Sequence, residues 1–454
     1  MIKENQVFYK SRSVVWRREN DKELIVRYND TFLHLNETAS LIFHYCEGMN
    51  LIQIAECLRQ YGIPDSKNLT EAISGFLKTL LKEKLITTEL HRNIISGDYF
   101  LQKQEYTHTD FITPKLNIFR IGCTNYSRFT RPAAPLRIFL TLTYDCNLQC
   151  KTCYNDSLAH MSPRASTDTV IRIINKIKIS GVLEVILTGG EPFSRPDIFQ
   201  IIDYILLNGI SLRVNTNGLL LTDDYITELK KRKVVIITLG LDGVSEKTHD
   251  TIRGKGNFKK VVAIMKKLSA ADINLYVNFT VTHRNFFELF KLKKFLKGFH
   301  VSRIIINVFI SSGKGYAYRT TFALRKVEYA LILFSRLFNF AVSKPDMIIV
   351  TSCYAGYIEA NIDTSGSFFF CELLKKPLGN VLEKDIKAIW NSRKLLKLMD
   401  ADTFGTPCGK CFFRKSCRGV CRAEVFSATG DMYAGNPYCI RVKAVNWFVK
   451  TLLR

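Results

Sequence analysis

Three closely spaced cysteines directly after an apolar run limit most strongly what this chain can fold into. Segment 146–153 reads CNLQCKTC, so three residues separate Cys146 from Cys150 and two separate Cys150 from Cys153. Thiolates at this spacing can bind three irons of a 4Fe–4S cube from one loop and leave the fourth iron open. The run 136–144 (LRIFLTLTY) predicts a buried strand, and α/β folds place their sites at such strand ends. We therefore predict an α/β fold with an iron–sulfur site after this strand.

A second motif follows the next predicted strand. The apolar run 183–187 leads into Thr188 and then into the segment Gly189-Gly190-Glu191-Pro192. Glycines allow the backbone to approach a ligand closely, and a carboxylate beside them can bind a ligand's ammonium group. Buried or zinc-bound cysteines are the alternative explanation of the cysteine loop. That alternative leaves the second motif unexplained.

CNLQCKTCY followed by a strand that ends in GGEP resembles the radical SAM superfamily, where SAM is S-adenosylmethionine. The resemblance implies a partial (β/α)6 barrel whose cluster on Cys146, Cys150 and Cys153 binds SAM at its open iron. It also implies reductive cleavage of SAM to a 5′-deoxyadenosyl radical, which abstracts a hydrogen atom. By the same resemblance, four residues are expected at the SAM site: Gly189, Gly190, Glu191 and Pro192.

Strand-like and helix-like segments alternate from 134 to 342, which indicates parallel βα units. The predicted strands are 136–145, 183–188, 211–216, 234–241, 274–282 and 301–309. Six strands fit the partial barrel. By resemblance to the superfamily, Asn217, Asp242 and Arg253 lie near SAM or the substrate. Gly240 replaces the serine of the related SLDG motif, so we expect Thr238 or a water to substitute for that hydroxyl.

Residues 1–90 predict a small separate domain. Short β-like runs at 13–17, 24–28 and 32–35 precede helical patterns at 38–46, 51–58 and 69–80. Asn50 and Gln53 have the spacing of a capping box. This winged-helix-like α+β layout resembles the PqqD-like RiPP recognition element, which implies that the leader of a ribosomally made precursor peptide binds by strand addition. A DNA-binding winged helix is the alternative.

Segment 91–133 shows no sustained periodicity and predicts a linker. The formal net charge of +24 suggests anionic partners, but the lysines recur at helical spacing and predict solvated helix faces. We therefore expect no nucleic-acid partner. Apolar runs of membrane-spanning length and a signal-peptide core are both missing from the sequence, so we expect a cytoplasmic protein without a membrane partner.

Residues 343–454 hold seven cysteines in the order C-x12-G-x4-C, C-x2-C-x5-C-x3-C and C. A zinc ribbon, which is the alternative, needs only four of them. The pattern resembles the SPASM extension of radical SAM enzymes and implies two auxiliary 4Fe–4S clusters. One is expected on Cys408, Cys411, Cys417 and Cys439, and the other on Cys353, Cys371 and Cys421 with an open iron.

Taken together, these resemblances predict a radical SAM oxidoreductase that modifies a precursor peptide, forming a thioether or another crosslink. Glu372 follows Cys371 at a position that is acidic in some SPASM oxidases, where it serves as a base. A flavodoxin or ferredoxin is the expected electron donor. Two alternatives remain: a formylglycine-forming radical SAM enzyme, and a metal-stapled nucleic-acid-binding protein that contains zinc.

Overall fold

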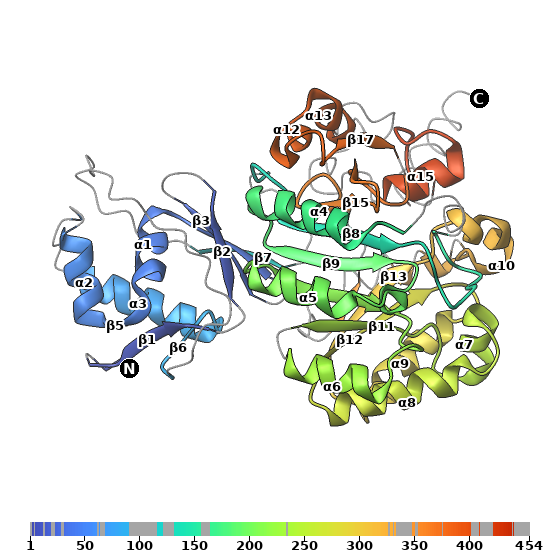
Figure 1. Ribbon diagram of the computed structural model, residues 1–454, viewed down its shortest axis with the longest axis horizontal. Helices are drawn as coiled ribbons and strands as arrows, with labels where there is room; N and C mark the ends of the chain where they lie inside the picture. The colour runs from blue at the N-terminus through green and yellow to red at the C-terminus, as the bar shows by residue number, and fades with distance from the viewer. Residues whose placement is uncertain are drawn as a thin grey trace, which may run out of the picture. The chain divides into compact units, whose positions relative to one another are not determined.

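The computed structural model describes most of the chain (Figure 1). The described residues are 2–3, 5–11, 14–19, 23–28, 31–60, 63, 69–89, 116–120, 131–155, 164–232, 235–325, 327–329, 331–332, 347–349, 353–374, 376–400, 408, 421–437 and 439. Cys411 and Cys417 lie outside them. Two compact units form, one of Met1–Thr130 with Ile205–Ser211 and one of Arg131–Tyr204 with Leu212–Arg454.

The N-terminal unit is an α+β domain with two small antiparallel sheets. The first has the order β2 (Val15–Arg18), β3 (Leu24–Tyr28), β4 (Thr31–Leu35) and β7 (Leu116–Arg120). The second has the order β5 (Glu47–Asn50), β1 (Val7–Lys10) and β6 (Ile86–Thr87). Three helices complete it: α1 (Glu37–Tyr45), α2 (Leu51–Gln60) and α3 (Leu69–Lys82). Their apolar faces fill one core, in which Leu33, Ile54 and Leu77 are buried.

The three predicted strands and three predicted helices of this domain are confirmed. The capping box is also present, because Gln53 N donates to Asn50 Oδ1 at 3.0 Å and Asn50 N donates to Gln53 Oε1 at 2.9 Å. The second sheet was not predicted, since its strands have only two to four residues. Strand β7 lies inside the segment predicted as a linker and pairs antiparallel with β4, Ile118 opposite Leu33.

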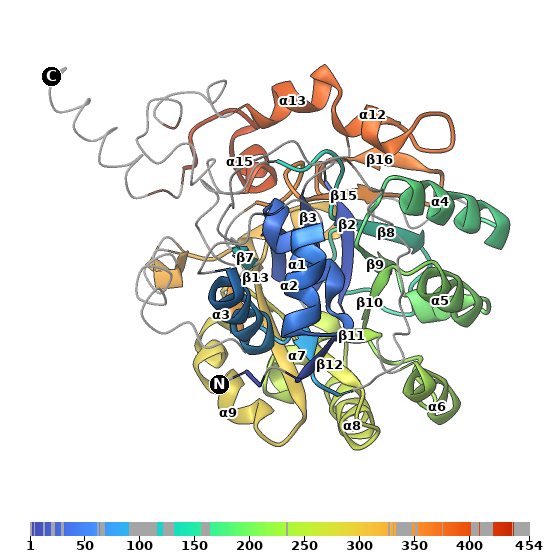
Figure 2. The ribbon, with the colours of Figure 1, turned by 90° about the vertical axis from the view of Figure 1, so that its left-hand side faces the viewer.

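The larger unit contains the six parallel strands that the sequence predicts. They are β8 (Arg137–Thr143), β9 (Glu184–Gly189), β10 (Ser211–Thr216), β11 (Ile236–Gly240), β12 (Asn274–Val281) and β13 (Val301–Val308). The connecting helices are α4 (Thr167–Ile179), α5 (Ile198–Leu207), α6 (Asp223–Lys231), α7 (Glu246–Arg253), α8 (Asn257–Ala270) and α9 (Leu289–Leu296). Figure 2 shows α4, α5, α6, α8 and α9 around the outside of these strands. The partial α/β barrel is thereby confirmed.

Alternate residues of each barrel strand face opposite sides of the sheet. On β12, Leu275, Val277 and Phe279 are fully buried. Their neighbour Tyr276 projects to the opposite face, where the guanidinium of Arg213 lies 5.1 Å from the ring centroid. Strand β11 separates β10 from β12 in the sheet, so this contact crosses the concave interior. The polar residues of the strands therefore line the inside of the barrel.

Buried charges close the amino-terminal end of the barrel. Glu184 is completely buried and binds both Arg137 and Arg213, the latter at 3.1 Å. Arg137 also lies 3.5 Å from Glu359, which begins β15 (Glu359–Ile362). These side chains come from strands that are neighbours in the sheet. Since this end is filled, the open space for a ligand lies toward the carboxyl ends of the strands.

The cysteine-rich C-terminal region continues the barrel sheet instead of forming a separate layer. Strand β15 pairs parallel with β8, and β16 (Ser367–Phe369) and β17 (Pro377–Asn380) follow antiparallel. Strand β14 (Met347–Ile349) pairs with β13 at the other end. Trp390, which ends α12 (Ile386–Trp390), is fully buried and donates Nε1–H to Pro132 O at 2.8 Å. Residues on both sides of the predicted boundary at 342 thus belong to one compact unit.

Local signals position the barrel helices. Ser166, Thr222 and Ser245 cap the N-termini of α4, α6 and α7 with side-chain hydrogen bonds, each worth about 1 kcal/mol. Lys230, Lys266 and Lys294, which the sequence predicts to lie on solvated helix faces, are exposed. Among the helices that the structure describes, none has both the length and the apolar character needed to cross a bilayer.

Candidate active site

The cysteine loop packs directly against the two glycines of the GGEP motif. Gly190 N donates to Thr143 O at 2.7 Å, and Glu191 N donates to Asp145 O at 2.8 Å. A Cβ atom on Gly190 would lie 2.1 Å from Asp145 O, and one on Gly189 would lie 2.2 Å from Thr143 O. The close approach that these glycines permit is therefore to the backbone that leads into Cys146. Sequence reasoning assigned that approach to a ligand.

Glu191 fixes the end of β10. The residue is fully buried, and its carboxylate accepts hydrogen bonds from Thr216 Oγ1 at 2.7 Å and from Asn217 N at 2.8 Å. Phe193 N donates a third, at 3.1 Å. Burial raises the pKa of Glu191, and these hydrogen bonds oppose the rise. Sequence reasoning predicted a contact of this carboxylate with a ligand and missed its three protein donors.

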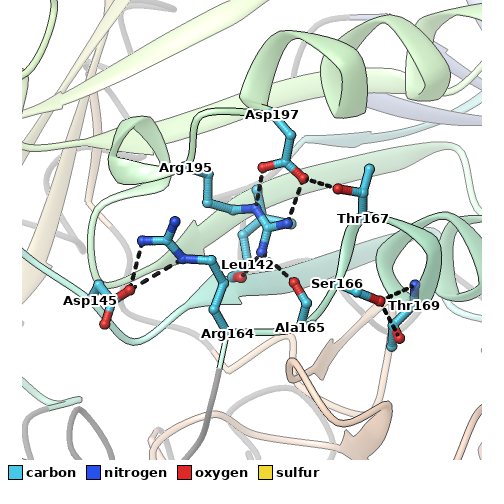
Figure 3. Close-up of polar contacts among 9 residues, drawn as sticks. All are labelled: Leu142, Asp145, Arg164, Ala165, Ser166, Thr167, Thr169, Arg195 and Asp197. Carbon is cyan, nitrogen blue, oxygen red and sulfur yellow. Dashed lines mark hydrogen bonds and ion pairs between the residues drawn. The ribbon is translucent and has the colours of Figure 1, made fainter.

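Figure 3 shows how two arginines anchor the start of the cysteine loop. Arg195, which follows the 3₁₀ turn η3 (Pro192–Ser194), is buried and donates to Leu142 O at 3.1 Å and to Ala165 O at 2.9 Å. Asp197 holds the guanidinium by two further bonds. Arg164 pairs with Asp145, the residue before Cys146, at 2.8 Å. The entry to the loop is thus fixed by the segments on either side of α4.

Cys146, Cys150 and Cys153 lie near one another on one loop, although the described residues contain no group of three His, Cys, Asp or Glu side chains placed around a single metal-ion position. Burial raises the pKa of Cys150 to about 11, and the other two thiols contribute to the rise while Arg253 opposes it. Asn217 Nδ2 donates to Asn147 Oδ1 at 2.7 Å and lies 3.8 Å from Cys146 Sγ. Three thiolates at this proximity would repel one another, and a bound iron–sulfur cluster would relieve that repulsion. The donor set therefore fits the predicted cluster.

Asp242 and Arg253 form a buried pair beside these thiols. Arg253 Nε donates to Asp242 Oδ2 at 2.6 Å, and Thr280 N donates to Asp242 Oδ1 at 3.0 Å. Burial acts to lower the pKa of Arg253, but Asp242 and the thiols of Cys150 and Cys146 raise it above its usual value. The site thus keeps a permanent cation next to the cysteine loop.

The glycine that replaces the serine of the related motif makes room for this arginine. A Cβ atom on Gly240 would lie 2.4 Å from Arg253 Nη2. Two residues earlier on the same face of β11, Thr238 is buried, and its Oγ1 has no hydrogen-bond partner within the described part of the chain. An unpaired buried hydroxyl is costly. The contact of Thr238, or of a water in its place, with a ligand stays a prediction.

Tyr154 links the cysteine loop to the C-terminal cysteines. It follows Cys153, and its hydroxyl donates to Glu372 Oε1 at 2.9 Å. Burial raises the pKa of Tyr154 well above its usual value, with Glu372 as the next cause. Glu372 is thus half-buried beside the cysteine loop. Sequence reasoning singled out Glu372 but missed its tyrosine partner, whose only sequence signal was its position next to Cys153.

The C-terminal cysteines that the structure describes form two groups. Cys353, Cys371 and Cys421 lie close enough for the first two to raise the pKa of Cys421, after burial as the main cause. Cys421 caps α15 (Arg422–Thr429). Separately, Cys408 packs with Cys439 and Tyr433. The two ligand sets that the resemblance implied stay a prediction, and two of their members, Cys411 and Cys417, fall outside the described residues.

Comparison with known proteins agrees with this geometry. Residues 140–295 match the family model described as the Radical SAM superfamily, and residues 353–417 match the SPASM model, an iron–sulfur cluster-binding domain. The AdoMet-dependent heme synthase of Methanosarcina barkeri is 28% identical over 341 residues, covering 68% of this chain and 97% of the relative. Mycofactocin maturase MftC of Mycobacterium tuberculosis is 26% identical, covering 68% of this chain and 83% of the relative.

Among solved structures, Streptococcus suis SuiB bound to its precursor peptide SuiA resembles the whole chain. The TM-score is 0.66 at 15% identity, and the match covers 96% of this chain and 100% of SuiB. This likeness supports the fold. The chain therefore contains a radical SAM domain and a SPASM domain. It is an oxidoreductase whose cofactors are SAM, a SAM-binding 4Fe–4S cluster and auxiliary clusters.

Proposed function

We propose that this radical SAM oxidoreductase modifies a ribosomally made precursor peptide and forms a thioether or another crosslink in it. The main support for this proposal is the hydrogen bond between Tyr154 and Glu372. Tyr154 follows a cysteine of the SAM-cluster loop, and Glu372 follows a cysteine of the proposed auxiliary site. A substrate residue near Glu372 would therefore be close to both sites, as an oxidative crosslink requires.

The relatives support this reaction class. Proteins similar to this chain include MftC, the subtilosin biosynthesis protein AlbA and PqqA peptide cyclase. The heme synthase is 28% identical to this chain and MftC is 26% identical, so the similarity alone does not select a peptide substrate. The resemblance of the N-terminal unit to a leader-binding domain favours a peptide substrate over a small molecule. A domain of that kind has no evident use in an enzyme that acts on a small molecule.

Several residues of the site receive a role in this proposal. Cys146, Cys150 and Cys153 would hold the cluster that, when bound, supplies the electron for SAM cleavage. Arg253 would offer a cation and Thr238 a hydroxyl to polar groups of SAM or substrate. Glu372 would accept a proton from the substrate, and the strand edge of the N-terminal sheet would bind the leader.

The proposed partners are a leader-bearing precursor peptide and a one-electron donor such as a flavodoxin or ferredoxin. A thioether forms when a carbon loses a hydrogen atom, the cysteine loses its S–H proton, and one electron leaves to the protein's clusters. The peptide therefore loses two hydrogens for each bond. No atom is added to the peptide. Formylglycine made from cysteine instead loses the sulfur and gains an oxygen, whereas formylglycine made from serine also loses two hydrogens and is recognised by its aldehyde.

The test is mass spectrometry of a small cysteine-containing peptide encoded beside the gene. The peptide is incubated anaerobically with the holoenzyme, SAM and a reductant. We expect a mass loss of two hydrogens per crosslink, together with formation of 5′-deoxyadenosine. Loss of the cysteine sulfur, or a product that has lost two hydrogens and reacts with an aldehyde reagent, would instead support the formylglycine alternative. SAM cleavage that no peptide stimulates would contradict the proposed substrate class.

A further inference from the structure

A glycine-containing segment after β13 lies against the SAM-cluster loop. We call residues 309–318 the clamp segment; it ends in the 3₁₀ helix η5 (Gly313–Tyr318). Gly315 N donates to Cys153 O at 3.0 Å, and Lys314 Nζ donates to Gln149 Oε1 at 3.3 Å. The clamp segment therefore contacts the loop on both sides of Cys150.

Two positions of the clamp segment require glycine for different reasons. Gly313 has a φ of +54°, and a Cβ atom there would lie 2.3 Å from Tyr154 O. A Cβ atom on Gly315 would lie 2.9 Å from the ring of Phe309. Backbone atoms cannot yield as a flexible side chain can, so any larger residue at Gly313 must push Tyr154 away. The close contact between the clamp segment and the loop thus depends on glycine, which has no side chain, at both positions.

The clamp segment has a fixed support. Phe309 N donates to Val281 O at 2.9 Å, and the Phe309 ring packs with Ile252 and Phe322. Ile252 O also accepts a hydrogen bond from Lys151 N of the cluster loop, at 2.9 Å. One small core therefore holds the clamp segment and the middle of the loop. Ile252 precedes Arg253, so the cation beside the thiols has the same support.

A second support comes from the C-terminal region. Ser427 Oγ of α15 donates to Ser311 O at 2.8 Å. Helix α15 begins after Cys421, one of the three cysteines of the proposed auxiliary site. In Figure 1, α15 and α10 (Arg319–Phe322), which follows the clamp segment, lie toward the same end of the barrel. The contact joins the element that carries an auxiliary cysteine to the clamp segment.

We propose that the clamp segment positions the SAM-cluster loop, with Gly313 and Gly315 as positioning residues. The GGEP motif fixes the backbone before Cys146, and the clamp segment fixes the backbone after Cys150. This inference rests on the proposed function only in that the loop must hold the SAM cluster. A loop held at both ends presents its three thiols in one arrangement, and a displacement of about 1 Å in such a site can cost about 10²-fold in rate.

The test compares Gly313→Ala and Gly315→Ala with Gly298→Ala in the anaerobic holoenzyme. Gly298→Ala controls for the added methyl group alone, because a Cβ atom there would meet nothing within 4 Å and Gly298, unlike Gly313, has no positive φ. The measurements are SAM cleavage by dithionite-reduced enzyme without peptide and the change that SAM causes in the electron paramagnetic resonance spectrum of the reduced cluster. We expect Gly313→Ala to lose about 10²-fold in cleavage and to lose the spectral change, and Gly298→Ala to keep both.

Lys314→Met and Ser427→Ala test whether any loss in Gly313→Ala is caused only by unfolding. Each of these two changes removes one side-chain hydrogen bond and leaves the backbone packing in place. We expect both to alter the SAM-dependent spectrum at an unchanged Tm, with smaller losses of cleavage than Gly313→Ala. Wild-type cleavage and spectra in Gly313→Ala would overturn the proposal. So would a misfolded Gly313→Ala combined with wild-type spectra in Lys314→Met and Ser427→Ala. Absence of SAM cleavage in the wild type would count against the proposed function instead.

Discussion

At the scale of single residues, the hydrogen bond from Tyr154 to Glu372 makes a specific prediction. Replacing Glu372 by Gln removes the proposed base, and we expect peptide modification to fall about 10²-fold while SAM cleavage continues. Tyr154→Phe leaves the carboxylate in place but removes the donor that orients it. We expect an intermediate loss. The measurement is the ratio of modified peptide to 5′-deoxyadenosine.

Tyr204→Phe serves as the control for this pair, because Tyr204 donates a comparable hydrogen bond, to Asn175 Oδ1 at 2.8 Å, between α5 and α4. Its product ratio is expected to match that of the wild type. If Glu372→Gln lowered SAM cleavage and peptide modification equally, Glu372 would support the SAM site instead of acting as a base.

His249 gives the site a predictable dependence on pH. Burial lowers its pKa to about 4, Arg253 adds to the effect, and three carboxylates oppose it: Asp242, Asp250 and Glu288. Between pH 6.5 and about 4 the unfolded chain binds a proton on this histidine that the folded chain does not. The free energy of unfolding therefore falls as the pH falls, by about 3 kcal/mol in total.

The measurement is Tm as a function of pH for the wild type, His249→Gln and His300→Gln. Glutamine keeps an acceptor for Asp242 N, which donates to His249 Nδ1 at 3.3 Å, but it does not titrate. We expect His249→Gln to flatten the decline below pH 6.5. His300 is exposed, and its replacement should leave the decline unchanged. Equal slopes for all three proteins would contradict this role of His249.

The grouping of the three loop cysteines was predictable from the sequence, whereas the partners of the other site residues were not. The spacing of Cys146, Cys150 and Cys153 places them in one short segment, which is why a shared site could be predicted there from local sequence alone. The orientation of Glu191 toward Thr216 and Asn217 depends on how β9 and β10 pair. Likewise, Gly240 is explained only by Arg253, which comes from the following helix. Contacts between elements leave no trace in local sequence patterns.

At the scale of elements, the buried charges at the amino-terminal end of the barrel predict a large effect of substitution on the free energy of unfolding. Glu184 is fully buried between Arg137 and Arg213, so Glu184→Gln leaves two arginines without their shared counter-charge. We expect the free energy of unfolding to fall by about 3–5 kcal/mol. Lys259→Gln, which breaks an exposed pair with Glu246, should cost at most about 1 kcal/mol. Denaturant unfolding of both variants provides the comparison. Similar losses in the free energy of unfolding would show that the buried charge cluster contributes little to stability.

The barrel strands were predictable because each has several apolar residues that face the helices. Strand β15 was not, since Glu359–Ile362 is short and contains two polar residues. Its position in the sheet is set by its pairing with β8 and by the contact of Glu359 with Arg137. Long-range pairing of this kind also explains why the predicted boundary at 342 does not separate two compact units.

At the scale of the whole molecule, the two groups of C-terminal cysteines predict the metal content. Three 4Fe–4S clusters correspond to about twelve irons per chain. We expect about eight when Cys146, Cys150 and Cys153 are all changed to Ala. The triple change of Cys353, Cys371 and Cys421 should also leave about eight, while the reduced protein still responds spectroscopically to SAM. Iron, sulfide and zinc analysis of anaerobically purified protein is the measurement, and zinc in place of iron would contradict the cluster assignment.

Strand β7 has a consequence for how any partner reaches the N-terminal sheet. Residues 116–120 of the chain itself cover the edge of β4, so a leader that adds to this edge must displace an internal competitor whose effective concentration is in the millimolar range. Weak or unrelated peptides would then be rejected by competition. The double change Ile118→Pro and Phe119→Pro removes β7 hydrogen bonds. We expect a labelled peptide of residues 114–122 to bind this variant and not the wild type. A peptide with the same residues in scrambled order should not bind the variant. Recognition at this edge would thus be an exchange of strands, in which the chain sets the minimum affinity of its own substrate.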